Sequence, residues 1–311
     1  LVKPASREPD RFGDEIARLR YGSCLVSIPL AVHRRGQLER PRWWESPDPK
    51  KHILVEAVSC MADDTFLEMM KRALGNDGND ILVFVHGYAN AFENCVLTGA
   101  RLKHDTEFAG PLVVFAWPSE GKTFNWLNPS GPYRRDEAKA KASYGALAEC
   151  FAALIRQRDA AGRGEIHVLA HSMGSRIVLE ALRTVDERLN REDKPFGHVI
   201  FAAPDVDVRT FVEAFPSVSR LSDDVTLYYC EDDVALKTSQ GIHMDSRMGQ
   251  YRLKMDGLHN IDCKNANTSW IGHGYVVDRD MLLVDLQILL TRDLSPPQRR
   301  PSAPPGRPTG R

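Results

Sequence analysis

The stretch "VLAHSMGSRIVLEAL", residues 168–182, decides the fold because its hydrophobic periodicity changes at a single serine. Residues 166–170 form an apolar run of strand length. After Ser172 the apolar side chains recur at helical spacing from Ile177 to Leu189. The pattern therefore predicts a strand, a sharp turn that carries the serine, and a helix.

Close packing at such a turn requires small residues two positions before and two positions after the serine, and Ala170 and Gly174 stand there. The stretch "AHSMG" resembles the G-x-S-x-G nucleophile elbow of the α/β-hydrolase superfamily, with Ala170 in place of the first glycine. In this interpretation Ser172 is a catalytic nucleophile. The simpler alternative is a serine that caps the following helix. A second motif upstream favours the nucleophile.

That motif is "LVFVHGYANAFEN", residues 82–94, an apolar strand that ends at His86 and Gly87. Gly87 permits close approach of the backbone, which brings the amide of Tyr88 toward the site. The segment resembles the His-Gly loop that supplies one oxyanion-hole amide in the superfamily, and the amide of Met173 is expected to supply the other. Two such donors stabilise the charge that develops on a tetrahedral intermediate. His86 itself is interpreted as shaping the loop.

A serine hydroxyl needs a general base, and the superfamily's chain order places an acid and then a histidine after the nucleophile. His273 lies between two glycines just before the last predicted helix, and we predict it as the base. His243 is the second candidate. His259 lies in "GLHNIDC", which is predicted to be the last strand. If His273 is not the base, the role passes to His243 or His259.

The acid is expected on a loop after a late strand, and three consecutive acidic residues ending at Asp233 follow the strand predicted at 225–230. Asp233 is predicted as the acid because a short helical pattern follows it, and adjacent Asp232 then projects to solvent. Asp205 and Asp207, after the preceding strand, are alternatives. The simpler interpretation of these two residues is a turn that caps a short helix.

Short β-branched runs alternate with amphipathic segments along the chain, as in an α/β protein whose mostly parallel sheet is covered on both faces. Strands are predicted at residues 23–30, 52–58, 81–86, 112–117, 166–170, 198–203 and 225–230. Helices are predicted at residues 64–74, 92–105, 136–158, 175–190, 208–215 and 278–292. We expect an N-terminal extension with edge strands at 1–50, the main domain at 51–294 and a disordered Pro/Arg-rich tail at 295–311.

Composition excludes several classes of function. With 41 basic and 42 acidic residues, no overall positive field favours nucleic acid. Six cysteines without a CxxC pair predict buried, reduced thiols and no metal site. No apolar run reaches the roughly 18 residues of a membrane span. The charged first residues favour a cytoplasmic protein, although a removed leader also fits them.

Further segments, among them "VVFAWPSEG" (113–121) and "DDVAL" (232–236), look like one bacterial branch of the α/β-hydrolases of unknown function, over roughly residues 20–290. The resemblance implies an α/β-hydrolase fold. It also implies that Trp117 borders the cleft and that Tyr133 and Asp136 begin the following helix. His86, Trp117 and Tyr133 are therefore candidates for substrate contact.

These residues predict a serine hydrolase that works through an acyl-enzyme and a Ser172-Asp233-His273 triad. The resemblance to the superfamily, and not the residues themselves, favours a small-molecule ester or a related acyl bond over an amide or a thioester as the substrate. No cofactor is required. Two alternatives remain: a lipase that docks on lipid through an apolar rim and the basic tail, and a catalytically silent binding module. The sequence predicts neither the acyl chain length nor the oligomeric state.

Overall fold

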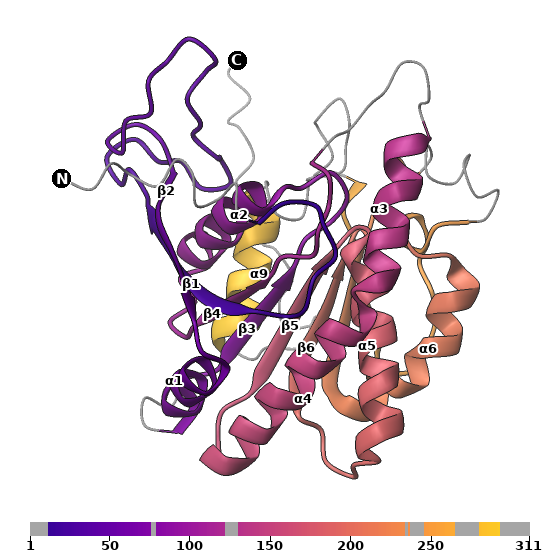
Figure 1. Cartoon of the computed structure of the whole chain (residues 1–311). Coiled ribbons are helices and arrows are strands. Elements are labelled where there is room, and N and C mark those ends of the chain that lie inside the picture. Colours follow the sequence, from indigo (N-terminus) through magenta and orange to yellow (C-terminus); the bar gives the residue numbers. More distant parts are fainter. Residues whose placement is uncertain are drawn as a thin grey trace, which may run out of the picture.

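A computed structural model describes residues 12–75, 79–121, 130–233, 236, 246–264 and 280–292. Within these ranges six strands form a parallel sheet in the order β4-β3-β5-β6-β7-β8 (Figure 1). Its strands are β3 (Ile81–Val85), β4 (Leu112–Phe115), β5 (Ile166–His171), β6 (Phe196–Ala202), β7 (Ser222–Tyr229) and β8 (Leu258–Asp262). The predicted α/β class is confirmed.

Strand β3 lies inside the sheet, and its sequence shows why. All five of its side chains are apolar and buried. A strand covered on both faces needs such a continuous apolar run rather than an alternating one. Val83 pairs with Val113 of β4 on one side and Val168 of β5 on the other. Because the strands are parallel, their carboxyl ends meet at one edge, where open α/β sheets bind ligands.

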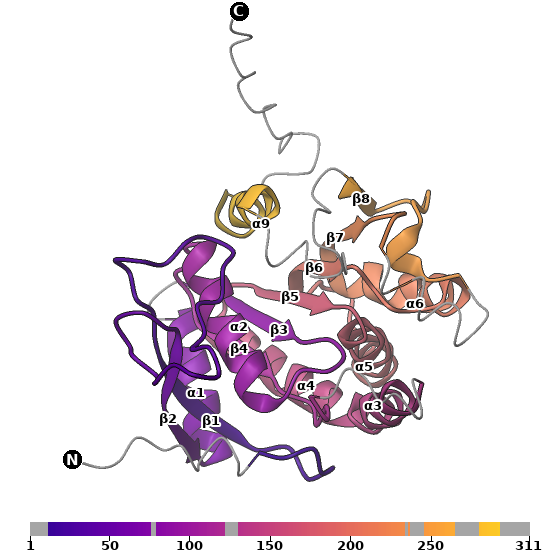
Figure 2. The same ribbon diagram turned by 90° about the horizontal axis from the view of Figure 1, so that it is seen from above.

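Helices cover both faces of the sheet (Figure 2). One face carries α1 (Asp63–Gly75), α4 (Tyr144–Ala161), α5 (Gly174–Leu189) and α6 (Val208–Leu221), with α3 (Gly131–Ala142) beside α5. The other face carries α2 (Phe92–Asp105) and α9 (Asp280–Arg292). A short 3-10 helix, η2 (Met248–Gln250), precedes β8. None of the helices in the described part of the chain is long and apolar enough to cross a membrane.

The apolar core divides into two clusters, one on each face of the sheet. Val83 and Ile177 belong to the cluster beneath α1, α4, α5 and α6. Leu82, Phe84 and Leu286 belong to the cluster beneath α2 and α9. Neighbouring residues of β3 thus point to opposite faces, as the pleat of a strand requires.

Two further strands, β1 (Tyr21–Ser27) and β2 (Leu54–Met61), pair antiparallel in a separate two-stranded sheet. A cavity of about 1350 Å³ is lined by β1 on one side and by β4 on the other. The hairpin therefore stands beside the parallel sheet, and in the described residues it does not share a hydrogen-bonded ladder with it. Residues 28–53 connect its two strands.

The helix predicted at 136–158 is two helices, α3 and α4, which meet at Ser143. The hydroxyl of Ser143 donates to the carbonyl of Lys139 (2.8 Å), a back-bond that is associated with bent helices. The helix predicted to end at 215 continues through Pro216 to Leu221. Burial of Val218 and Leu221 offsets the roughly 3 kcal/mol that an interior proline costs.

The cysteine prediction is partly wrong. All six thiols are free, and four are buried: Cys95, Cys150, Cys230 and Cys263. Cys24 and Cys60, in the β1–β2 hairpin, are exposed. Four consecutive residues of β1, Gly22 to Leu25, are exposed, so the apolar sequence of this strand did not indicate burial on either face.

Candidate active site

Ser172 occupies the turn between β5 and α5 and has a left-handed backbone, with φ of +53°. Its amide donates to the carbonyl of Ala202 at the end of β6 (2.9 Å), and its own carbonyl accepts from the amide of Ser175 (3.0 Å). The N-cap of α5 is Met173, and no side chain caps that helix. Helix capping therefore does not account for Ser172. A non-glycine residue in this conformation costs on the order of 1–3 kcal/mol and is held by its surroundings.

Two glycines allow the elbow and the loop after β3 to touch. A Cβ on Gly174 would lie 2.4 Å from the carbonyl oxygen of His86, and a Cβ on Gly87 would lie 2.7 Å from the Cβ of Ser172. Ser172 itself is 2% exposed. Gly87 therefore packs directly on the serine side chain, and the Tyr88 peptide follows it immediately.

Asp136, at the buried side of α3, ties down the loop that carries Tyr88. Its carboxylate accepts hydrogen bonds from the amide of Ala89 (3.1 Å), the hydroxyl of Ser119 (2.5 Å) and the amide of Glu120 (2.9 Å). Ala89 has φ of +57°. The carboxylate thus holds a strained backbone directly after Tyr88 and joins it to the loop after β4.

His86 and Trp117 brace the same loop from within the protein. Their rings stack 4.9 Å apart at 3°, and the Trp117 indole donates to the carbonyl of His86 (2.8 Å). The His86 ring nitrogens lie 3.0 Å from the carbonyl of Gly87 and 3.2 Å from that of Trp117. Burial lowers the pKa of His86 to about 4, so the ring is neutral at pH 7 and donates from one nitrogen only. Both side chains are buried, and their contact with a substrate stays a prediction.

Tyr133 begins α3 and is also buried. Its hydroxyl donates to Oδ2 of Asp205 (2.6 Å), and its ring lies 5.5 Å from that of Tyr88. Burial raises the pKa of Tyr88 to about 12, so its phenol stays protonated. Tyr133 thus contacts both the loop after β3 and the loop after β6.

Asp233, the predicted acid, follows β7 and is fully buried. Its amide donates to the carbonyl of Cys230 (3.2 Å), and its Oδ1 accepts from the amide of Leu236 (3.0 Å). Adjacent Asp232 is exposed, with a carboxylate oxygen 3.9 Å from Nζ of Lys264. The opposite orientations expected of these two neighbours are therefore present, while the catalytic role of Asp233 stays a prediction.

The two alternative acids both have structural partners. Asp207 caps α6 by accepting from the amide of Thr210 (2.8 Å), as the simpler interpretation predicted. Asp205 is buried, with Oδ1 3.4 Å from Nε of Arg247 and 3.7 Å from Nη2 of Arg176. Its amide donates to the carbonyl of Ser172 (3.2 Å), so this buried ion-pair network adjoins the elbow.

Arg176 and Arg247 are the members of the site that sequence reasoning missed. Arg176 sits in the first turn of α5, where the helix dipole disfavours a cation. Burial alone would lower the pKa of Arg176, but Asp205, Tyr133 and Glu137 raise it above its ordinary value. An arginine at a helix start was therefore a signal for a nearby acid. Arg247 lies far along the chain and gave no comparable signal.

The candidate bases are the least described part of the site. His273 and His243 lie outside the described residues. His259 lies in β8, where its Nε2 is 2.9 Å from Oδ1 of Asp224. The assignment of the base to His273 stays a prediction.

Within the described residues, one group of side chains is close enough together to hold a metal ion: His33, His104 and Asp105. Nε2 of His33 lies 2.8 Å from Oδ1 of Asp105, and its Nδ1 lies 2.8 Å from Oε2 of Glu39. Burial alone would lower the pKa of His33, but these two carboxylates raise it. Both ring nitrogens are thus already paired with carboxylates, so the cluster is explained as an ion pair that fastens the 28–53 loop to α2.

The chain belongs to the family described as "Alpha/beta hydrolase of unknown function (DUF900)", which it matches over residues 62–292. None of the curated proteins compared matches it. It is similar to a solved lipase-esterase related protein from Clostridium acetobutylicum ATCC 824, with 12% identity and a TM-score of 0.36 over 71% of this chain and 97% of that one. It is also similar to LpqC, a poly(3-hydroxybutyrate) depolymerase from Bordetella parapertussis, with 16% identity and a TM-score of 0.36 over 70% of this chain and 80% of that one.

Proposed function

We propose that this α/β hydrolase is a serine hydrolase that cleaves an ester, or a related acyl bond, through an acyl-enzyme intermediate. The observation that carries the proposal is Ser172, held at φ of +53° between β5 and α5 with Gly87 packed on its Cβ. Strained backbone of this kind clusters at functional sites. The elbow also lies at the carboxyl edge of the sheet, beside the first turn of a helix whose dipole favours developing negative charge.

In the proposed mechanism the hydroxyl oxygen of Ser172 attacks the acyl carbon, and His273 accepts its proton. The amides of Tyr88 and Met173 bind the resulting oxyanion. The bond to the alcohol breaks as His273 returns the proton to the leaving oxygen, and Asp233 orients the imidazole throughout. Water, activated by the same histidine, then releases the acid and restores Ser172.

The experiment is steady-state hydrolysis of p-nitrophenyl acetate by the full chain and two serine variants. Ser172→Ala is expected to lose on the order of 10⁴ to 10⁶ in kcat. Ser175→Ala is the matched control because Ser175 is also buried and lies three residues further on, in α5. It should stay within about tenfold of the parent, or roughly 1.4 kcal/mol. An active Ser172→Ala protein contradicts the proposal.

A further inference from the structure

Two adjacent tryptophans stand in solvent in the 28–53 loop that joins β1 to β2. Trp43 is 91% exposed and Trp44 is 59% exposed, and their rings meet edge to face 5.2 Å apart. Leu30 of the same loop is 73% exposed. Large apolar side chains that gather on a surface mark an interaction site more often than singly scattered ones do. Nothing in the hydrolase site accounts for them.

The loop runs along α2 toward the edge of the sheet that holds Ser172. It is fastened to the last residue of α2 by the His33–Asp105 pair, and Arg40 is in electrostatic contact with Glu93 in the first turn of that helix. Because α2 follows β3, its first turn lies at the carboxyl edge of the parallel sheet. The chain then continues past this turn to the tryptophans.

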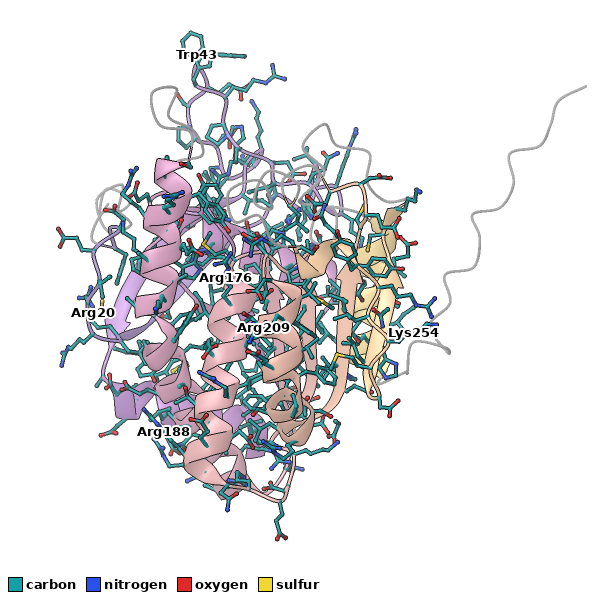
Figure 3. The ribbon with its side chains drawn as sticks, turned by 90° about the vertical axis from the view of Figure 1, so that its right-hand side faces the viewer. Arg20, Trp43, Arg176, Arg188, Arg209 and Lys254 are labelled. Atoms are coloured by element: carbon teal, nitrogen blue, oxygen red, sulfur yellow. The ribbon has the colours of Figure 1, made fainter. Side chains whose placement is uncertain are left out.

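Figure 3 shows the same relation from the side. Trp43 projects at the top of the molecule, Arg176 in the first turn of α5 lies near the middle, and Arg188 in its last turn lies toward the bottom. Ser172 immediately precedes α5. Trp43 therefore projects on the side of the molecule where the elbow lies.

The exposed charged side chains of the loop that carries the tryptophans are mainly basic. Within residues 28–53, all of which are described, one acid is exposed, Glu45, against five exposed cations: Arg34, Arg40, Arg42, Lys50 and Lys51. The guanidinium of Arg42 lies 5.4 Å from the centre of the Trp44 ring. Indole rings favour the headgroup level of a bilayer, and cations near them are attracted to anionic phospholipids. This combination matches a lipid surface better than it matches an apolar protein groove.

We propose that Trp43 and Trp44 form an interfacial anchor that docks the protein on an anionic phospholipid bilayer, with the Ser172 edge of the sheet turned toward the lipid. The esters that reach Ser172 are then lipid-borne. This statement about the substrate rests on the proposed function, whereas the docking stands without it.

Docking is tested by sedimentation of the full chain with vesicles of phosphatidylcholine and phosphatidylglycerol in equal parts, and with vesicles of phosphatidylcholine alone. Binding to the anionic vesicles is expected to be tighter and to weaken as salt rises, because added salt screens the basic side chains. Trp43→Ala/Trp44→Ala should weaken it by at least about tenfold through the loss of buried apolar area. Lys50→Gln and Lys51→Gln should each weaken it about fivefold.

Two control variants lie elsewhere on the surface. Met69→Ala removes an exposed apolar side chain of α1, and Arg188→Gln removes an exposed cation at the far end of α5. Neither should change vesicle binding. Because the two tryptophans are exposed, their double variant should unfold at the parent's temperature, and a matching melting curve excludes misfolding as the cause of lost binding.

Three results would overturn the docking. The first is no vesicle binding by the parent, and the second is equal binding by the parent and the tryptophan variant. The third is a parent that binds no vesicles but forms a dimer, which the tryptophan variant does not form. The substrate statement has its own readout, the rate on a vesicle-borne p-nitrophenyl ester divided by the rate on soluble p-nitrophenyl acetate. That ratio should fall in the tryptophan variant and stay constant in Met69→Ala; an unchanged ratio contradicts it. Vesicle binding without hydrolysis of either ester would refute the proposed function and leave the docking in place.

Discussion

Replacing Gly87 by alanine tests whether the loop after β3 positions the nucleophile. The new Cβ would lie 2.7 Å from the Cβ of Ser172 and 3.1 Å from both Nδ1 and the carbonyl oxygen of His171. Two carbons rest at about 3.5 Å or more, so Ser172 and residue 87 must separate by about 0.8 Å. A misplacement of about 1 Å can cost on the order of 10² in rate. We therefore expect kcat/KM to fall by about 10- to 100-fold, or about 1.4–2.7 kcal/mol in barrier.

The assay is p-nitrophenyl acetate hydrolysis together with the rate of fluorophosphonate labelling, which reports on the serine without substrate binding. Urea unfolding should show a stability loss of about 1–3 kcal/mol from overpacking. Gly145→Ala is the matched control, since a Cβ there meets nothing within 4 Å. It should leave both rates unchanged and stabilise α4 by less than about 1 kcal/mol. A Gly87→Ala protein that is labelled at the parent rate would refute the positioning argument.

Three further predictions concern groups around the elbow. Asp136→Asn leaves at least one of three donors without an acceptor and should lose about 2–3 kcal/mol in urea unfolding; unchanged stability would contradict the role of this carboxylate. Because the pKa of His86 is low in the fold, the unfolded chain binds more protons than the folded chain between pH 6.5 and about 4. The free energy of unfolding therefore decreases as the pH is lowered through this window. His86→Gln should remove about 2 kcal/mol of the loss between pH 7 and pH 5, and an unaltered pH profile would show that His86 is not neutral in the fold. Asp233→Asn should lose on the order of 10⁴ in kcat by favouring the wrong imidazole tautomer, whereas Asp232→Asn should keep a kcat within about tenfold of the parent. If Asp232→Asn loses its activity and Asp233→Asn keeps it, the catalytic acid is Asp232.

Strong local patterns made most of the fold predictable. Each predicted strand is present with ends displaced by up to three residues, because buried parallel strands need apolar runs that stand out from their surroundings. The division of residues 136–158 into two helices was not predictable. A serine is common inside helices, and the hydrogen bond from the Ser143 hydroxyl to the carbonyl of Lys139 is visible only in the structure. The continuation of α6 through Pro216 depends on tertiary burial that no local pattern records.

The site was predictable where chemistry and chain geometry coincide. Ser172, Gly87 and Gly174 follow from a turn that tolerates only small neighbours, and the structure brings the three together. The pairing of Asp205 with Arg247 was not predictable, because Arg247 comes from a segment that pairs with the loop after β6 only in the fold. Exposure of Trp43 was equally hidden, since tryptophans in a sequence usually indicate burial.

Intact-mass analysis after treatment with a fluorophosphonate probe shows whether Ser172 is an activated nucleophile. We expect one adduct per chain, located by peptide sequencing at Ser172, and no adduct on Ser172→Ala. Labelling should also slow as pH drops through about 6 to 7, where the imidazole of the base becomes protonated. A chain that takes no label, or takes it at another residue, would contradict the proposed role of Ser172.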